Sequence, residues 1–324
     1  MDAQIFSLET NDFTEMEDAL STWDHRYRQI SPGAFHGGLL HTQVGSLGIF
    51  RNRWERAIHY RGGAPEGTIG IGLNMAQTGE PRWLGQRVAF DELIIQRCGT
   101  EAEYLSGALW DSVVFAIPEA ELAQQISDIT HDDPEAILRG LGLARLTPQL
   151  AAQLRQASLA YLDTAARSLA TPGAPSPLPA MAASLVGLIA RALVSARPPC
   201  APKPSLNRQR QLIRKTEEYV AHLADQPLRI GQLCSELDVS ERTLRHTFHR
   251  LVGLGPLAYL KTHRLNRVYR ALRDDDPTEV LIKQVALANG FTHFGQFSRD
   301  YKQLFGESPS ETLQRCKPGN RLHG

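Results

Sequence analysis

Two stretches in the last third of the chain are built alike, and this repetition constrains the fold more than any other feature. Residues 230–260 and 282–313 each contain a short amphipathic helix pattern, a turn, a longer amphipathic pattern and an exit of the form L-x-G-x-x-P. Ser240 and Thr292 stand where an N-cap hydroxyl would start the second helix of each pair. A helix-turn-helix joins two helices through a short turn, and its second helix enters the major groove of DNA. The repetition therefore predicts two DNA-binding units, joined by one long helix over residues 256–273.

Helical periodicity extends across this whole region. Apolar residues at helical spacing predict seven helical segments, at 209–224, 230–237, 240–252, 256–274, 278–290, 293–306 and 308–316. Residues 206–324 hold 19 basic and 13 acidic side chains, whereas residues 1–205 hold 16 basic and 22 acidic ones. Such an asymmetry is typical of a nucleic-acid-binding module joined to another domain.

The motifs of residues 228–315 resemble those of the AraC/XylS family of bacterial transcription regulators. The family's tail signature is matched by Gly290-Phe291, Phe297-Ser298-Arg299, Tyr301-Lys302, Phe305-Gly306 and Ser308-Pro309, with Tyr301 in place of phenylalanine. The first half matches at Leu233, Ser240, Arg242-Thr243-Leu244, Phe248, Gly253, Pro256, Leu260 and Arg264-Leu265, and departs at Cys234 and Leu254-Gly255. In spacing, the second unit is similar to the subset containing the ethanolamine-operon regulator and pseudomonad regulators of quorum sensing and virulence.

The resemblance implies which residues contact DNA. Base readers would be Arg242, Arg245 and His246 in the first unit and His293, Gln296 and Arg299 in the second. Arginine can bind guanine O6 and N7 as a fork, and glutamine can bind adenine N6 and N7. Contacts to the DNA backbone would come from Ser240, Thr243, Lys261, Arg264, Thr292, Ser298 and Lys302. The alternative for each charged residue is a solvated surface side chain, and Phe248, Leu251, Phe297, Tyr301 and Phe305 are interpreted as core.

The first 130 residues are predicted to form a β-domain. Short β-branched and aromatic runs at 39–45, 46–54, 57–63, 68–76, 87–97 and 110–117 are separated by glycine-containing turns, which favours a sandwich or barrel. The family resemblance implies a cupin-like β-barrel here. A helix over about 12–27, capped by Asn11 or Asp12, and another that starts at Pro118 complete the expected elements.

Proline-rich segments divide the rest of the chain. Residues 171–179 and 197–204 cannot sustain a helix, whereas 147–169 and 180–196 are predicted helices with wide apolar stripes. These stripes would pack on the β-domain or form a subunit interface. The expected class is therefore α+β: a cupin-like barrel (1–130), a helical dimerisation segment with linker (131–205) and a double helix-turn-helix domain (206–324).

No catalytic or metal signature stands out in the sequence. His36 and His41 are five residues apart, on opposite faces of a strand, and His59 is isolated, so no metal site or cofactor is expected. The GxG of TIGIGL lacks the third glycine of a dinucleotide fingerprint and is interpreted as a strand. The four tryptophans, Trp23, Trp54, Trp83 and Trp110, would form either plain core or an apolar pocket. Four widely spaced cysteines fit a reducing cytoplasm, and neither a signal peptide nor a membrane span is expected.

The sequence thus predicts a transcription regulator that binds double-stranded promoter DNA and is not an enzyme. The resemblance implies a homodimer, a role as activator in virulence, quorum-sensing or catabolic control, and RNA polymerase and a small-molecule effector as further partners. The alternative is a first domain that only dimerises or binds another protein.

Overall fold

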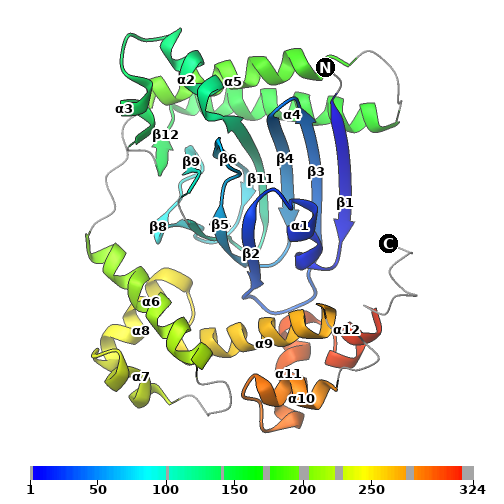
Figure 1. Ribbon diagram of the computed structural model, residues 1–324, viewed down its shortest axis with the longest axis vertical. Helices are drawn as coiled ribbons and strands as arrows, with labels where there is room; N and C mark the ends of the chain where they lie inside the picture. Colours follow the sequence, from blue (N-terminus) through cyan, green and yellow to red (C-terminus); the bar gives the residue numbers. More distant parts are fainter. Residues whose placement is uncertain are drawn as a thin grey trace.

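The computed structural model describes residues 3–99, 102–139, 142–170, 176–196, 204–222, 229–274 and 281–315. The chain is an α+β protein with an N-terminal β-sheet domain and a C-terminal domain of helices. Figure 1 shows the sheets between two helical layers, with α4 and α5 on one side and α6 to α12 on the other.

The β-domain consists of two antiparallel sheets that face each other. In hydrogen-bonded order, the larger sheet holds β1 (Gln4–Thr10), β3 (Gly37–Val44), β4 (Leu47–Trp54), β11 (Trp110–Pro118), β6 (Thr68–Gln77), β9 (Glu92–Arg97) and β12 (Leu143–Arg145). The smaller sheet holds β2 (Asp24–Gln29), β5 (Ile58–Gly63), β10 (Ala102–Leu105), β7 (Arg82–Trp83) and β8 (Gln86–Arg87). All six runs expected to be strands contain strands.

The expected cupin-like barrel is not confirmed, because the described strands do not close into a barrel. Within the described residues, each sheet keeps two free ends, and no hydrogen-bonded ladder joins one sheet to the other. Bulky aromatic side chains separate the facing surfaces, and helices cover the outer surfaces, so apolar area is buried without closing the strands into a ring.

Helices α4 (Pro148–Ala170) and α5 (Leu178–Ser195) pack on the outer face of the larger sheet, together with α2 (Glu119–Ser127). Alternate residues of β6, Ile69, Ile71 and Leu73, are fully buried beneath them. Helix α5 is the one described helix with the length and hydropathy of a membrane span; 44% of it is buried, and its buried side packs against α2, α4 and the larger sheet. A short helix α3 (Pro134–Arg139) precedes β12.

The expected helix over 12–27 is largely wrong. Helix α1 (Phe13–Ala19) begins where predicted, because the Asp12 carboxylate accepts a hydrogen bond from the Thr14 amide at 2.9 Å. The chain then turns, and Asp24–Gln29 forms strand β2, paired with β5. Side chains of β2 alternate between the space between the sheets and the outer surface, as expected for a strand paired with β5.

All seven predicted C-terminal helices are present. They are α6 (Pro204–His222), α7 (Ile230–Glu236), α8 (Glu241–Val252), α9 (Pro256–Asp274), α10 (Ile282–Ala288), α11 (Phe294–Phe305) and α12 (Pro309–Arg315). Helices α8 and α11 each end at a left-handed glycine, Gly253 at φ 73° and Gly306 at φ 79°. The long helix α9 joins the two helix-turn-helix units, as predicted (Figure 1).

Candidate functional site

The two expected recognition helices, α8 and α11, begin in different ways. The Ser240 hydroxyl accepts a hydrogen bond from the Thr243 amide at 3.1 Å, which makes Ser240 the predicted N-cap. The second helix begins one residue later than expected, with His293 at the N-cap position and no side-chain cap. Thr292 is therefore exposed and does not cap the helix, contrary to the sequence prediction.

The side chains predicted to read bases lie on the exposed faces of these helices. On α8 these are Arg242, Arg245 and His246, and on or beside α11 they are His293, Gln296 and Arg299. The opposite faces are buried, as predicted, at Phe248, Leu251, Phe297, Tyr301 and Phe305. Both recognition helices thus offer a polar surface, and the base contacts themselves stay a prediction.

Neighbouring side chains position several of these polar groups. Arg245 pairs with Glu241 at 2.6 Å, and the Arg299 guanidinium donates to the Gln296 side-chain oxygen at 3.0 Å. Lys261 on α9 pairs with Asp300 on α11 at 3.0 Å. Thr243, Ser298 and Lys302 are exposed near the same surfaces.

Arg264 differs from the other candidates because it is only 6% exposed within α9. A phosphate contact needs a guanidinium at the surface. Arg264 lies in the protein interior instead, so its position does not fit the predicted contact with the DNA backbone. The sequence could not separate it from Lys261, which lies three residues earlier and is exposed.

We expect Arg299→Ala to weaken binding to the operator by about 1–3 kcal/mol and to leave binding to random DNA nearly unchanged, because it removes a base fork. Lys302→Ala should weaken both equally and reduce the salt slope by about one unit, because it removes a phosphate contact. Fluorescence anisotropy on operator and scrambled duplexes at two salt concentrations measures both effects. Equal losses on both duplexes for Arg299→Ala would contradict its placement in the groove.

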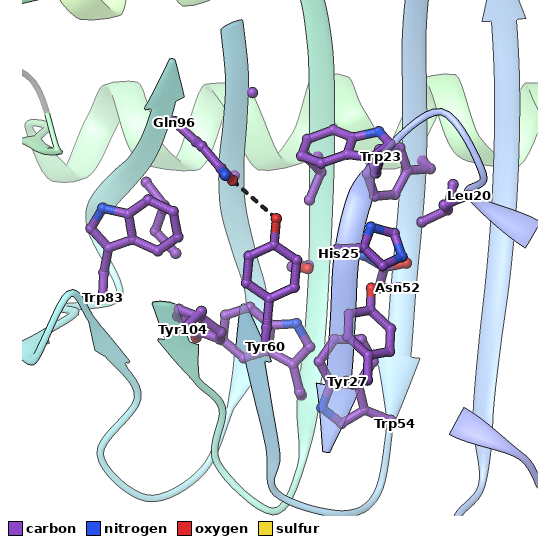
Figure 2. Close-up of a pocket in the computed structure, with 17 residues that line it drawn as sticks. Leu20, Trp23, His25, Tyr27, Asn52, Trp54, Tyr60, Trp83, Gln96 and Tyr104 are labelled. Atoms are coloured by element: carbon purple, nitrogen blue, oxygen red, sulfur yellow. Dashed lines mark hydrogen bonds between the residues drawn. The ribbon is translucent and has the colours of Figure 1, made fainter. Parts of the chain in front are cut away.

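A second candidate site is an apolar cavity of about 90 Å³ between the two sheets. All four tryptophans line it, together with Tyr27, Tyr60 and Tyr104 (Figure 2). The sequence left open whether these tryptophans were core or pocket; they are buried or half-buried and they surround this cavity.

Glycines of β6 make room for the cavity. Gly70 and Gly72 alternate with Ile69, Ile71 and Leu73, so the glycines face the cavity and the apolar side chains face α4 and α5. A Cβ added at Gly70 would lie 2.9 Å from the Trp23 ring. The GxG motif is thus a strand, as predicted, and it also forms a wall of the pocket.

Four buried polar atoms of the pocket residues lack a hydrogen-bond partner within the described residues. They are His25 Nε2, Asn52 Oδ1, Trp83 Nε1 and the Tyr104 hydroxyl. By contrast, the Tyr60 hydroxyl donates to the Gln96 side-chain oxygen at 3.2 Å (Figure 2). A buried polar group without a partner costs about 1–3 kcal/mol, so this arrangement fits a bound molecule that supplies both donors and acceptors.

The pocket is electrically neutral at physiological pH. None of the described residues that line it is an acid, a lysine or an arginine, and burial lowers the pKa of His25 to about 4. Burial also raises the pKa of the Tyr104 hydroxyl, which stays protonated. An unpaired charge would be strongly disfavoured here, so the pocket suits an uncharged ligand.

The C-terminal domain of helices packs directly on the outer surface of the smaller sheet and on α1. The Arg270 guanidinium donates to both Glu17 carboxylate oxygens, at 2.8 and 2.6 Å, and to the Tyr27 carbonyl at 2.6 Å. Asn266 accepts from the Gln29 amide at 3.0 Å and donates to the Gln29 carbonyl at 2.9 Å. Helix α9 is therefore bonded to the backbone of β2.

A buried polar cluster extends this interface. The Tyr259 hydroxyl of α9 hydrogen-bonds to Glu217 of α6 at 2.5 Å and to His59 of β5 at 3.0 Å. Burial lowers the pKa of His59 to about 4, so its ring is neutral. Arg28 and Arg61 hold the pKa of Glu217 down at about 2, against the effect of its burial.

The histidines considered for metal binding do not converge. His36 lies beside Asn11, His41 contacts the Phe50 ring edge, and His59 belongs to the interface. Within the described residues no group of three or more His, Cys, Asp or Glu side chains could hold a metal ion.

Comparisons with known proteins place the similarity in the C-terminal region. Residues 233–315 match the model of a helix-turn-helix domain. The probable thc operon regulatory protein of Rhodococcus erythropolis is 35% identical over 113 residues, which cover 35% of this chain and 33% of that protein. The XylDLEGF operon transcriptional activator of Pseudomonas putida is 35% identical over 79 residues, which cover 24% and 25%.

Among solved structures, a probable AraC family transcriptional regulator from Rhodopseudomonas palustris is 37% identical to this chain, with a TM-score of 0.30. The match covers 33% of this chain and 99% of that chain. The matches span only a third or a quarter of the length of these two curated relatives.

Proposed function

We propose that the chain belongs to the AraC/XylS family of bacterial transcription regulators through its C-terminal domain, and that it binds promoter DNA and activates transcription in response to a small effector. The observation that carries the proposal is the pair of recognition helices, each with a polar exposed face, that α9 holds in one domain. The two curated relatives described above are transcription regulators, not enzymes. The cytoplasm is the compartment this role requires, and RNA polymerase is the partner that activation requires.

The effector pocket we propose is the tryptophan-lined cavity. Its neutral lining and its four unpartnered polar atoms favour a compact, uncharged, largely apolar molecule with both a donor and an acceptor. The volume of about 90 Å³ is of the same order as an engineered cavity of about 150 Å³ that binds benzene, so a single ring is a suitable size.

Strand β2 provides a route from this pocket to the DNA-binding domain. His25 and Tyr27 line the pocket, while the Tyr27 carbonyl and the Gln29 backbone bond to α9. A ligand that shifts the two side chains displaces the same backbone that holds α9. Effector binding would thereby change how the helix-turn-helix units are presented to DNA.

A thermal-shift screen of uncharged ring compounds on the full-length protein tests the pocket. A compound at about 100 times its Kd should stabilise the protein by about 2.7 kcal/mol. Gly70→Val should abolish the shift, because its side chain would occupy space beside Trp23. Gly63→Val is the matched control, since no described atom lies within 4 Å of a Cβ added there. A shift that persists in Gly70→Val would place the ligand elsewhere, and a screen without stabilising compounds would favour the alternative of a purely dimerising domain.

We also propose a homodimer through α4. Leu159 and Leu169, each 40% exposed, lie with Ala166 on the outer side of this helix, whose other side packs on the sheet. Light scattering at micromolar concentration should give twice the monomer mass, and Leu159→Glu should shift the protein toward monomer because it places a charge in the interface. A wild-type monomer, or an unchanged dimer in Leu159→Glu, would count against this surface.

A further inference from the structure

A second cavity, of about 430 Å³, lies between the two domains and is lined by charged side chains. Arg28 of β2 and Arg61 of β5 form one wall, and Arg214 of α6 and Arg267 of α9 form the other. No residue of α8 or α11 is among its lining, so it is separate from the predicted DNA-contacting faces. It is equally distinct from the neutral tryptophan-lined pocket.

The cavity has an excess of positive charge. Its four arginines face two carboxylates, Glu217 and Glu218, while burial and Arg28 lower the pKa of His263 to about 3 and keep that ring neutral. Glu217 is already bonded to Arg28 and Arg61, each at 2.9 Å.

Next to the cavity, the carboxylate of Glu103 forms ion pairs with three arginines. Glu103 pairs with Arg61 at 2.5 Å, with Arg210 at 3.3 Å and with Arg214 at 3.8 Å. Adding Glu103 and Arg210 gives five arginines against three carboxylates, so the excess of two charges remains. Within the described residues, the carboxylates around the cavity therefore carry less charge than its arginines.

The strand pairing adds a like-charge contact on the same sheet surface. Arg26 lies directly opposite Arg61 across the β2–β5 ladder, and Arg28 follows two residues later on the same face. Like charges directly opposite each other destabilise a sheet, and Asp24 at the start of β2 is the one acid of this strand on that face. An anion bound in the cavity beside Arg28 and Arg61 would offset part of this repulsion.

We propose that the interdomain cavity binds a multiply charged oxyanion, such as a phosphorylated or polycarboxylated small molecule. Guanidinium groups bind phosphate and carboxylate oxygens as bidentate forks, and several arginines converging on one cavity provide the geometry for two or more negative charges. Because the arginines come from both domains, the anion joins the β-domain to α6 and α9. It is thus a second ligand, which stabilises the docked arrangement.

Isothermal titration calorimetry tests this site. The full-length protein is titrated with pyrophosphate and with citrate, and chloride keeps the ionic strength constant. Saturable binding should weaken at least tenfold in Arg267→Gln, a change that leaves the ion pairs of Glu217 with Arg28 and Arg61, and those of Glu103 with Arg61 and Arg210, intact. Arg87→Gln, at an exposed arginine on β8, and Lys302→Ala, on the predicted DNA surface, should bind as the wild type does. Binding of pyrophosphate alone would identify a phosphoryl ligand, and binding of citrate alone a carboxylate ligand.

Three results would overturn the proposal: no saturable binding of either anion at millimolar concentration, equal affinity in Arg267→Gln and wild type, or loss of binding in Lys302→Ala. Anion binding should also raise the melting temperature of the wild type and of Arg87→Gln, and not that of Arg267→Gln. A circular-dichroism melt without anion confirms that each variant is folded.

Discussion

Phe297→Ala is expected to lower the free energy of unfolding by about 3–5 kcal/mol and to abolish DNA binding. Phe297 is 2% exposed, and its ring lies 5.0 Å from the Phe291 ring and 5.8 Å from the Tyr301 ring. Removing it opens a cavity beneath α11, and these contacts fix the roll of the helix. Urea denaturation measures the loss, and anisotropy on operator DNA measures binding.

Ser298→Ala is the control for this experiment, because its exposed side chain neighbours Phe297 and does not support the core. It should change stability by less than about 0.5 kcal/mol. If Phe297→Ala unfolds at the same urea concentration as Ser298→Ala, the packing described for the second helix-turn-helix is incorrect.

Arg270→Ala is expected to be comparably severe, with a loss of about 3–5 kcal/mol in the free energy of unfolding, because the buried carboxylate of Glu17 loses its arginine partner and keeps only the hydrogen bond from the Tyr27 amide. The Tyr27 carbonyl loses its donor in the same variant. The DNA-binding domain should separate from β2, so that DNA affinity no longer responds to an effector. Denaturant unfolding and anisotropy with and without effector measure the two consequences.

Two further variants test the cause of the Arg270 effect. Arg270→Lys retains the positive charge but cannot donate two parallel hydrogen bonds to the Glu17 carboxylate. Its free energy of unfolding should therefore lie between those of the wild type and Arg270→Ala. Arg208→Ala removes an exposed arginine of α6 and should leave both stability and effector response unchanged. An Arg270→Ala protein that keeps its full effector response would show that the coupling does not pass through this contact.

The helical domain could be predicted from the sequence because its signals are local. Apolar spacing and capping residues such as Ser240 lie within a few residues of the element they define, and all seven helices were found. Local signals also explain the error at 12–27. Strand β2 depends on its pairing with β5, whose residues lie 29 to 39 positions later in the chain, and no local sequence pattern identifies that partner.

The pocket and the domain interface depend on contacts between distant residues. The alternation of Gly70 and Gly72 with apolar residues was visible in the sequence and could have indicated a hollow on one face of β6. The pairing of Arg270 with Glu17 joins residues 253 positions apart, so neither spacing nor composition could reveal it. Burial of Arg264 was invisible for the same reason.

Strand β2 lies directly between the pocket and α9, and it contacts each of them through different atoms. The pocket meets its odd-numbered side chains, His25 and Tyr27, whereas α9 is held by main-chain atoms that every amino acid other than proline provides in full. In the proposed effector response, the pocket contact and the contact with α9 therefore use different atoms of this strand, and at Tyr27 different atoms of one residue. If the proposed pocket binds an effector, exchanging the side chains of His25 and Tyr27 should change which molecule binds and leave the main-chain bonds to α9 in place.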